Sequence, residues 1–521
     1  MKKINRYIYH FLLMATVCLS ACKKNNLEEI TKLEVNRVFS TPGLTATIVN
    51  KTGVKLTWNA VPNATSYTIE VYDNADFTGT PVKSITSITA AQLPYTITGL
   101  IGDTQYAIRV KGVAQGIADS KWVSTSAKTD TEQIFQTVNQ TKLTASSVVL
   151  NWTPGETATT ITILPGNITH TVTAAEIAAG EATITGLTGE TDYSAKLLAG
   201  TKVRGTATFT TLYNFTGATL VSPSDNLATL IANATAGTVF GLAPGTYTVN
   251  ADVIASKSIT IRGTKPTDRP IINGMVLRLK SNAGLTVKDV ILDGTGSLNG
   301  NQTFIYDEAS DNAYGNFVLE NSVVRNYTKG LFYVNLKVLI ESVTFKGNII
   351  NNIECNGGDF IDFRSGLTKT LNFTNNTVYA AVLARDFIRM DPAGSTNFPG
   401  IISVINVVTN TLNGISNGAS NRLFYVRLAK HEIYFSKNIV ASSGGILTNQ
   451  LSTNIVAGNF TANNYFAAPT FISGSATAGA KYDAGTYTTL NPGFTSPSTG
   501  NFTISQQDLK TNGIGDPRWR N

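Results

Sequence analysis

The sequence predicts an all-β protein in which two small β-sandwiches precede a solenoid of stacked β-strands. Two observations favour this architecture. Residues 37–213 are rich in Thr, Val and Ile, in short alternating runs separated by Gly, Pro and Asn, and two halves of this region share the same motifs. From residue 214 onward, apolar strand-like segments recur at intervals of 21 to 33 residues, as expected for the coils of a solenoid.

The N-terminus has the pattern of a signal peptide. Three cations precede an apolar stretch, residues 7–17, that is too short to span a membrane as a mature helix. The segment LSAC, residues 19–22, resembles a bacterial lipobox, which implies that Cys22 is lipidated and begins the mature chain. We therefore expect residues 1–21 to be removed and residues 22–36 to form a linker behind a membrane anchor. The alternative is an ordinary secretory signal.

Composition limits the classes of function. The formal charge of +7 includes the three signal-peptide cations, which leaves +4 on the mature chain. This charge is too small to indicate nucleic-acid binding, although it suits an acidic ligand weakly. Cys18 leaves with the signal peptide and Cys22 is expected to be acylated, so Cys355 has no intramolecular disulfide partner. Stability must then come from burial of apolar side chains.

The two N-terminal repeats each contain a Trp on an early strand and a Leu six residues before a Tyr. The residues are Trp58, Leu100 and Tyr106 in the first repeat, and Trp152, Leu187 and Tyr193 in the second. This pattern resembles fibronectin type III domains, with boundaries at 37–130 and 131–213, and the Leu-to-Tyr spacing is that of a tyrosine corner. We expect these aromatic residues to lie in cores, and the modules to act as spacers or as surfaces for partner proteins.

The C-terminal region opens with a short amphipathic pattern in residues 222–249, with Ser224 or Asp225 as a plausible N-cap. The order of helix, strand and turn resembles the start of pectate-lyase-like right-handed parallel β-helices, and implies this pectin lyase-like fold for residues 214–521. Asn residues recur at the expected corners, where their amides can stack in ladders. We interpret them as structural: Asn321, Asn348, Asn375, Asn376, Asn410 and Asn438.

A second set of short strands recurs out of phase with the first: FIYDE at 304–308, LFYVN at 331–335, FIDFR at 360–364, FIRMD at 387–391 and LFYVR at 423–427. Apolar second and fourth positions predict that the third and fifth positions face outward on one ribbon. The third positions are Tyr306, Tyr333, Asp362, Arg389 and Tyr425, and the fifth are Glu308, Asn335, Arg364, Asp391 and Arg427.

This ribbon of charges and rings has a structural and a functional interpretation. Opposite charges on neighbouring strands stabilise a sheet modestly without any function. However, a ribbon that carries arginines and tyrosines suits a sugar ligand, because guanidinium groups bind carboxylates and hydroxyls and flat rings pack against pyranose faces. We assign substrate binding to Tyr306, Tyr333, Asp362, Asp391 and Tyr425.

The resemblance to β-helical lyases implies a possible chemistry for the same ribbon. In such enzymes a carboxylate-bound Ca²⁺ neutralises the uronate, and an Arg or Lys removes a carbon-bound proton. Asp359, Asp362 and Asp391 are the candidate Ca²⁺ ligands. The candidate bases are Arg364, Arg389 and Arg427, provided that their pKa values are lowered. The catalytic motifs of the best-known lyase and polygalacturonase families are absent from the sequence.

Three hypotheses follow. The protein is a surface-anchored protein that binds an acidic polysaccharide, an active polysaccharide lyase on the same ribbon, or a structural or adhesive surface protein. The tail at 491–519 resembles that of uncharacterised outer-membrane lipoproteins of bacterial glycan-utilisation systems, which implies exposure at the cell surface. Within this tail, we expect Phe494 and Trp519 to close the last coil.

Overall fold

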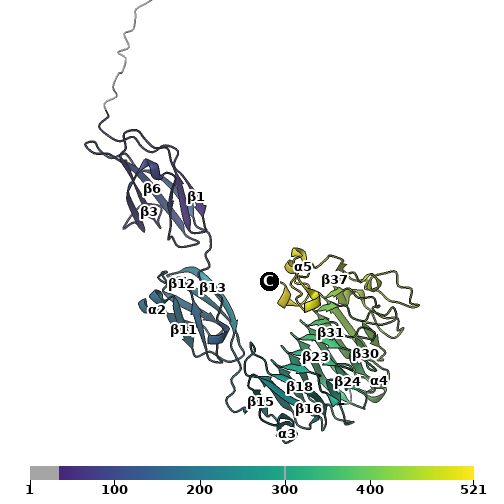
Figure 1. The fold of residues 1–521 in the computed structure, drawn as a ribbon. Helices are drawn as coiled ribbons and strands as arrows, with labels where there is room; N and C mark the ends of the chain where they lie inside the picture. Colours follow the sequence, from purple (N-terminus) through teal and green to yellow (C-terminus); the bar gives the residue numbers. More distant parts are fainter. Residues whose placement is uncertain (1–34, 299–300) are drawn as a thin grey trace, which may run out of the picture. The chain divides into compact units, whose positions relative to one another are not determined.

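The computed structural model describes residues 35–298 and 301–521 (Figure 1). The chain divides into two compact units between Asn214 and Phe215. The expected signal peptide, the expected lipidation site at Cys22 and most of the linker at 22–36 lie outside the described residues. Within the described residues, no helix is both long enough and apolar enough to cross a membrane.

The first sandwich consists of a three-stranded and a four-stranded antiparallel sheet, in the orders β1-β2-β5 and β4-β3-β6-β7. Trp58 and Tyr67 lie in the core, with their ring centroids 5.3 Å apart. The Tyr106 hydroxyl accepts a hydrogen bond from the Ile101 N–H at 3.0 Å, as predicted for a tyrosine corner. The strands are β1 Thr45–Val49, β2 Gly53–Thr57, β3 Ser66–Tyr72, β4 Lys83–Ile88, β5 Tyr95–Ile97, β6 Gln105–Val113 and β7 Val123–Lys128.

The second sandwich pairs a two-stranded sheet, β11-β8, with a four-stranded sheet, β10-β9-β12-β13. Trp152 is buried in its core, and the Tyr193 hydroxyl accepts a hydrogen bond from the Thr188 N–H at 2.9 Å. Both predicted tyrosine corners are therefore present. The elements are β8 Ser147–Asn151, β9 Thr160–Leu164, β10 Ile168–Thr171, α2 Ala174–Ala179, β11 Glu181–Thr185, β12 Asp192–Ala199 and β13 Lys202–Thr210.

The second unit is a parallel β-helix, as predicted, and its coils present three faces (Figure 1). The first face is a ten-stranded sheet. It contains β14 Thr219–Val221, β15 Val239–Leu242, β17 Ile259–Gly263, β19 Leu285–Lys288, β22 Phe317–Glu320, β25 Leu339–Lys346, β28 Leu367–Thr374, β31 Ser403–Val408, β34 His431–Ser436 and β36 Phe460–Thr461.

The second and third faces diverge from two long strands, β16 Thr246–Ala255 and β18 Ile271–Leu279. The first half of β18 pairs with β20, and its second half pairs with β21. The second face continues through β20 Ile291–Asp293, β23 Val323–Tyr327, β26 Ile349–Ile353, β29 Thr377–Tyr379, β32 Thr411–Asn413, β35 Ile439–Ala441, β37 Asn463–Phe466 and β38 Tyr487–Thr488. The third face continues through β21 Phe304–Tyr306, β24 Phe332–Val334, β27 Ile361–Phe363, β30 Ile388–Met390 and β33 Phe424–Val426.

Both ends of the β-helix differ in detail from the expectation. The helix α3 Leu227–Ala232 is capped by Asn226, which accepts from the Thr229 N–H, and not by Ser224 or Asp225. At the other end, the C-terminal segment packs against the outer side of the second face instead of closing the last coil. The Trp519 indole N–H donates to the Thr377 hydroxyl of β29 at 2.7 Å.

A ladder of buried Asn side chains follows the corner between the first and second faces. The oxygen of the first rung accepts from the Ser322 N–H, and every later side-chain oxygen accepts from the backbone N–H of the Asn one coil earlier. Each side-chain amide donates to the oxygen of the next Asn or, at the last rung, to Asp483. The rungs are Asn348, Asn376, Asn410, Asn438 and Asn463. Four of these residues were predicted as structural, and Asn463 extends the ladder. Asn321 and Asn375 instead adopt left-handed φ values of 49° and 57° at the same corner.

We expect Asn376→Ala to destabilise the β-helix by at least about 2 kcal/mol, because buried donors and acceptors lose their partners. The substitution removes the acceptor used by Asn348 and the donor to the Phe345 carbonyl. Urea unfolding of the chain from residue 23 onward would measure the change. The half-buried Asn351, on the adjacent strand, is the control, and its Ala variant should stay within about 0.5 kcal/mol of the wild type. Equal stabilities of the two variants would contradict a structural ladder.

Asp293 on the second face predicts a pH dependence of stability. Burial raises the pKa of this carboxyl, but hydrogen bonds from Asn326, Thr295 and Arg325 outweigh burial and lower the pKa from 3.8 to about 2. The ionised form is therefore favoured by folding, and the resulting stability is present above pH 4 and is lost as the pH falls toward 2.

We expect Asp293→Asn to be less stable than the wild type by roughly 2 kcal/mol at neutral pH, because the pKa is lowered by nearly two units. The difference between the two proteins should shrink as the pH falls from about 4 to about 2. Urea unfolding at a series of pH values would measure it, with the exposed Asp268→Asn as the control. A difference that does not change with pH would exclude this carboxylate as the source.

Candidate functional site

The third face carries two outward columns of side chains. In the first column, Ile305, Tyr333, Asp362, Arg389 and Tyr425 pair in successive parallel strands. The second column follows each strand and consists of Asp307, Asn335, Arg364, Asp391 and Arg427. Inward residues on either side of the first column, such as Phe332 and Val334 in β24, are fully buried. We call these two columns the ribbon.

The structure corrects the expected register in the first rung of the ribbon. Phe304 pairs with Phe332, so Ile305 takes the outward place that was expected for Tyr306. Tyr306 points inward, with 1% of its surface exposed and its ring centroid 5.0 Å from that of Tyr314. A shift of one residue reverses the face of every side chain in a strand. Tyr306 is therefore a core residue and not a substrate-binding residue.

The same shift replaces Glu308 with Asp307 in the second column. Asp307 forms ion pairs with Arg278 and Lys280, at N–O distances of 3.2 and 3.5 Å. Glu308 instead accepts a hydrogen bond from the Ser281 N–H at 2.6 Å. The first rung thus ends in an ordinary surface ion-pair cluster, and the remaining rungs hold the candidate site.

The aspartates of the site form an inner layer beneath the arginines. The side chains of Asp359 and Asp362 are 3% and 0% exposed, whereas that of Arg364 is 29% exposed. The Arg364 guanidinium donates to both oxygens of Asp362, at 2.6 and 3.0 Å, and to Asp359 at 3.1 Å. Asp362 therefore lies in the outward column as predicted, but Arg364 covers it.

The next rungs continue this arrangement. Arg389 donates to both oxygens of Asp391, at 3.1 and 3.0 Å, and to Asp359 at 3.3 Å. Arg427 donates to Asp391 at 2.8 Å. Every arginine and aspartate predicted for the site thus belongs to one connected network.

Sequence reasoning missed two members of this network, Asp386 and Arg422. Both oxygens of Asp386 accept from Arg422 at 3.3 Å, and the Arg422 guanidinium lies 4.8 Å from the ring centroid of Tyr425. A signal was present in the sequence. Asp386 and Arg422 immediately precede the segments FIRMD and LFYVR, as Asp359 precedes FIDFR.

The buried acids also hold the coils together. The Asp386 N–H donates to Asp359 at 3.2 Å, and the Arg422 N–H donates to Asp386 at 2.8 Å. Each carboxylate therefore accepts a backbone hydrogen bond from the following coil. Asp359 and Asp386 therefore connect neighbouring coils and also orient the guanidinium groups.

The electrostatics of the network do not provide an arginine base. Burial lowers the pKa of the Arg364 and Arg389 guanidinium groups, but the neighbouring carboxylates outweigh burial and raise both pKa values above the usual value. The condition that a catalytic arginine has a lowered pKa is thus not met at these two residues. Burial raises the pKa of Asp362, whereas hydrogen bonds from Arg389 and Arg427 offset burial at Asp391 and lower its pKa.

The expected Ca²⁺ ligands do not fit a metal in this arrangement. Asp359, Asp362 and Asp391 each accept hydrogen bonds from one or two guanidinium groups, which occupy the oxygen atoms that Ca²⁺ would need. Across residues 35–298 and 301–521, the structure contains no group of three or more His, Cys, Asp or Glu residues that could hold a metal ion.

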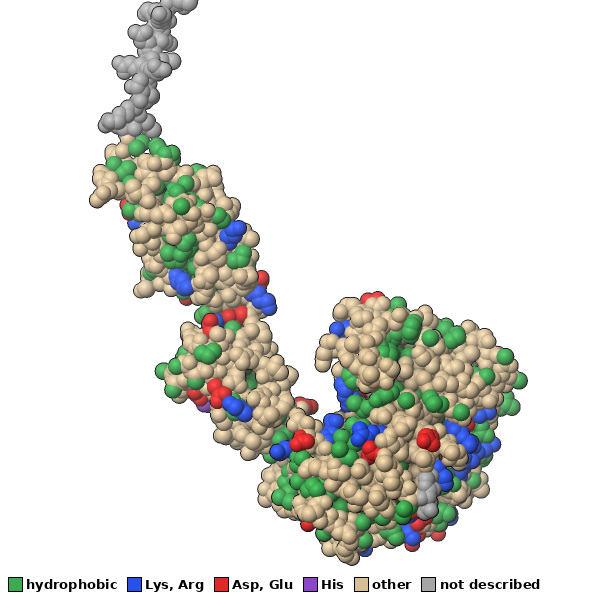
Figure 2. All heavy atoms as spheres, in the orientation of Figure 1, with side chains coloured by type: hydrophobic (Ala, Val, Ile, Leu, Met, Phe, Trp, Pro, Cys, Tyr) green, Lys and Arg blue, Asp and Glu red, His purple; other side chains and the backbone are tan. Residues whose placement is uncertain are grey.

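A short helix, α4 Ala393–Asn397, flanks the ribbon beyond its second column. The Asn397 side-chain amide donates to the Ser365 carbonyl at 2.7 Å, and the Ser395 hydroxyl accepts from the Ala429 N–H at 2.9 Å. The loop around α4 therefore contacts the coils before and after it. Lys and Arg side chains gather along the edge of the β-helix on which Figure 1 labels β24, β30 and α4 (Figure 2).

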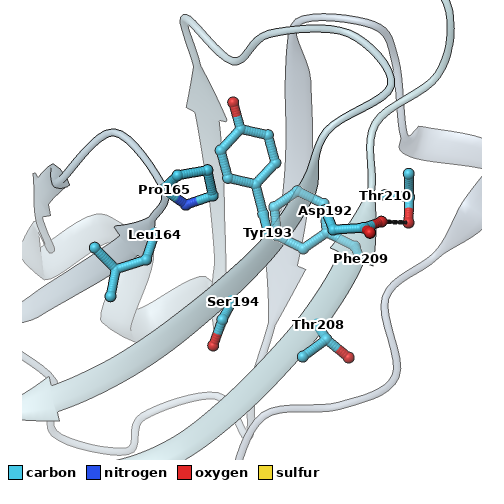
Figure 3. A pocket seen from close by; sticks show the side chains of 8 residues that line it. All are labelled: Leu164, Pro165, Asp192, Tyr193, Ser194, Thr208, Phe209 and Thr210. Carbon is cyan, nitrogen blue, oxygen red and sulfur yellow. Dashed lines mark hydrogen bonds between the residues drawn. The ribbon is translucent and has the colours of Figure 1, made fainter.

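A pocket also lies on the second sandwich, next to its tyrosine corner (Figure 3). Leu164, Pro165, Tyr193 and Phe209 supply most of its apolar lining. Asp192, the one charged residue among the eight that line it, accepts a hydrogen bond from the Thr210 hydroxyl at 2.5 Å. Because the Asp192 carboxylate is paired in this way, the pocket presents fewer charged groups to a ligand than the ribbon does.

Comparisons with known proteins match separate parts of the chain. Residues 245–381 match a family model described as a domain of unknown function (DUF4957), and residues 405–519 match a second one (DUF5123). A two-domain fibronectin type III segment from chicken tenascin is 16% identical, with a TM-score of 0.24, and the match covers 33% of this chain and 99% of that chain. An alginate lyase of the PL6 family, AlyGC, is 18% identical with a TM-score of 0.35, and the match covers 47% of this chain and 39% of the lyase. These likenesses concern the fold alone.

The network makes a prediction about stability. The double substitution Arg364→Ala with Arg389→Ala removes both guanidinium partners of the buried Asp359. We expect a loss of about 3 kcal/mol in the free energy of unfolding, because a buried carboxylate is left without its counter-charges. Adding Asp359→Asn to the double variant should recover part of the lost free energy of unfolding.

Urea unfolding would measure these changes, with Lys369→Ala as the control. Lys369 forms an exposed ion pair with Glu341, and its loss should cost less than about 1 kcal/mol. A double variant as stable as this control would show that the aspartate layer does not depend on the arginines.

Proposed function

We propose that the protein binds an acidic, uronic-acid-containing polysaccharide along the ribbon of the third face. The observation that carries this proposal is the two-layer arrangement of charge. Buried Asp359 and Asp362 and half-buried Asp391 hold the arginines from below. Arg364, Arg389 and Arg427 keep 29%, 20% and 32% of their side-chain surface exposed. The layer available to a ligand therefore consists of guanidinium edges and tyrosine rings.

This arrangement favours binding because the donors are already oriented. A free arginine loses side-chain entropy when it binds a ligand, whereas an arginine held by two carboxylate oxygens has lost much of that freedom on folding. Guanidinium groups donate two parallel hydrogen bonds to carboxylates, and they also donate to hydroxyls. The half-buried ring of Tyr333 offers a flat surface for a pyranose face, whereas the half-buried ring of Tyr425 lies among arginines and supports their guanidinium groups.

The repeat of the coils suits an extended ligand. Neighbouring rungs of a sheet lie about 4.8 Å apart, so a chain that lies along the ribbon meets a similar set of groups at each step. The loop around α4 lies beside these rungs and is bonded to the coils before and after it. A polymer matches this one-dimensional array better than a compact small molecule.

Binding is favoured over β-elimination on the same ribbon. A lyase requires a group that accepts a carbon-bound proton near neutral pH. The ribbon contains neither His nor Lys, and the pKa values of Arg364 and Arg389 are raised by the adjacent carboxylates. Burial also raises the pKa of the Tyr333 hydroxyl, which makes it a weaker candidate for a phenolate base.

The N-terminal features complete the proposal. A lipid on Cys22 would anchor the chain in the outer membrane, exposed at the cell surface, and the two sandwiches would act as spacers or would contact partner proteins. Mass spectrometry of the purified native protein would test the lipid, because diacyl or triacyl addition at Cys22 changes the mass of the N-terminal peptide.

The double substitution Tyr333→Ala with Tyr425→Ala tests binding without removing a partner of a buried carboxylate. We expect a loss of affinity for polygalacturonate of at least about tenfold, because the stacking surface of Tyr333 and the ring that supports the arginines at Tyr425 both disappear. Affinity gel electrophoresis of the chain from residue 23 onward would measure it. The control is Tyr434→Ala, since Tyr434 is 37% exposed on the first face.

The same samples should be followed by absorbance near 235 nm, where unsaturated uronates absorb. Retardation in the gel without a rise in absorbance is the expected result. A rise in absorbance would replace this proposal with an active lyase. Absence of retardation on acidic and neutral polysaccharides alike would contradict glycan binding and favour a structural or adhesive role.

A further inference from the structure

Three arginines surround a single tyrosine ring at the last rungs of the ribbon. The guanidinium carbons of Arg389, Arg422 and Arg427 lie 4.8, 4.8 and 4.7 Å from the ring centroid of Tyr425. They come from two coils, since Arg389 belongs to β30, and Arg422 and Arg427 flank β33. All three side chains are partly exposed, at 20%, 19% and 32%.

The counter-charges are unevenly distributed along the ribbon. Near Tyr333, the carboxylates of Asp359 and Asp362 face the single guanidinium of Arg364. Near Tyr425, the three arginines face only two nearby acids, Asp386 and Asp391, apart from one bond at 3.3 Å that reaches back to Asp359. The Tyr425 end is therefore the more positive of the two.

The donors at the Tyr425 end are not all used within the protein. Arg427 forms one ion pair, to Asp391, and its Nε is buried with no hydrogen-bond partner among the described residues. The two contacts of Arg422 with Asp386 are long, at 3.3 Å each. The nearby Asn449 oxygen accepts from the Arg422 Nε at 2.6 Å and fixes its orientation.

We propose that the three arginines around Tyr425 form a subsite for one carboxylate of the bound polysaccharide, whereas the Tyr333 end takes an uncharged part of the same chain. This inference rests on the proposed polysaccharide binding and assigns a direction to the ligand. Guanidinium groups match the planar, two-oxygen geometry of a carboxylate. A sulfate ester is another anionic group that sugars carry, and the experiment separates it from a carboxylate.

The test compares polygalacturonate with its fully methyl-esterified form, and adds a sulfated galactan as a third probe. Binding to the chain from residue 23 onward is measured by isothermal titration calorimetry for the wild type and for Arg427→Gln. Arg427 is suited to the test because its acid partner, Asp391, keeps Arg389 after the substitution. Arg278→Gln is the matched control, since Arg278 lies on the same face two strands before Tyr333 and forms ion pairs with Asp252 and Asp307.

We expect the wild type to bind polygalacturonate at least about tenfold more tightly than the ester, because a charged hydrogen bond contributes more than about 1.4 kcal/mol. Arg427→Gln should bring the affinity for the acid form close to the affinity for the ester, because it should weaken binding of the acid form much more than binding of the ester. Arg427→Lys keeps the positive charge but loses the two parallel donors of the guanidinium group. Its affinity for polygalacturonate should therefore lie between those of the wild type and of Arg427→Gln. Arg278→Gln should not alter the ratio of the two affinities.

Several results would overturn the subsite. Equal affinity of the wild type for the acid and the ester, or an equal loss for both in Arg427→Gln, would leave polysaccharide binding intact and remove the carboxylate subsite. Tight binding of the sulfated galactan alone would replace the carboxylate with a sulfate. No binding of any probe would overturn the proposed function, and the subsite with it. A melting temperature within a few degrees of the wild type would show that each variant is folded.

Discussion

The β-helix depends on satisfying the backbone and side-chain polar groups that its stacked corners bury. A parallel solenoid turns three times in each coil, and each turn places N–H and C=O groups where water is excluded. At one corner, the ladder that includes Asn376 and Asn410 meets this need with amides that both donate and accept. At another, Asp359 and Asp386 accept backbone N–H groups from the following coils.

The two corners solve the same problem with different consequences. An amide ladder is neutral and therefore needs no counter-charge. A buried carboxylate is costly unless a cation lies next to it, so the corner that uses aspartates also requires arginines above them. The charged ribbon therefore results from the use of aspartates at this corner of the coil. The proposed binding surface consists of what the buried acids leave exposed, namely guanidinium edges and the rings between them.

The sequence predicted the repeated features more successfully than the unique ones. The spacing of Leu to Tyr identified both tyrosine corners, and the recurrence of Asn identified most of the ladder. The register of FIYDE was wrong, because Ile305 and Tyr306 are both apolar enough to face inward and only pairing with Phe332 decides between them. The alternation of the strand placed Asp362 outward but could not show that it is buried. The position of Arg422 before its segment is visible in the sequence, but its pairing with Asp386, 36 residues away, depends on a contact between coils.

The C-terminal segment has a consequence for how the chain is made. Trp519 contacts Thr377, and Arg518 donates to the Gly347 carbonyl, so residues 142 and 171 positions apart in the sequence meet on the second face. Coils of a solenoid can otherwise form one after another from the N-terminus, each on the coil before it. Here the outer side of the middle coils stays uncovered until Arg518 and Trp519 have been synthesised. A polypeptide that must first cross a membrane would therefore finish this part of its structure only on the far side.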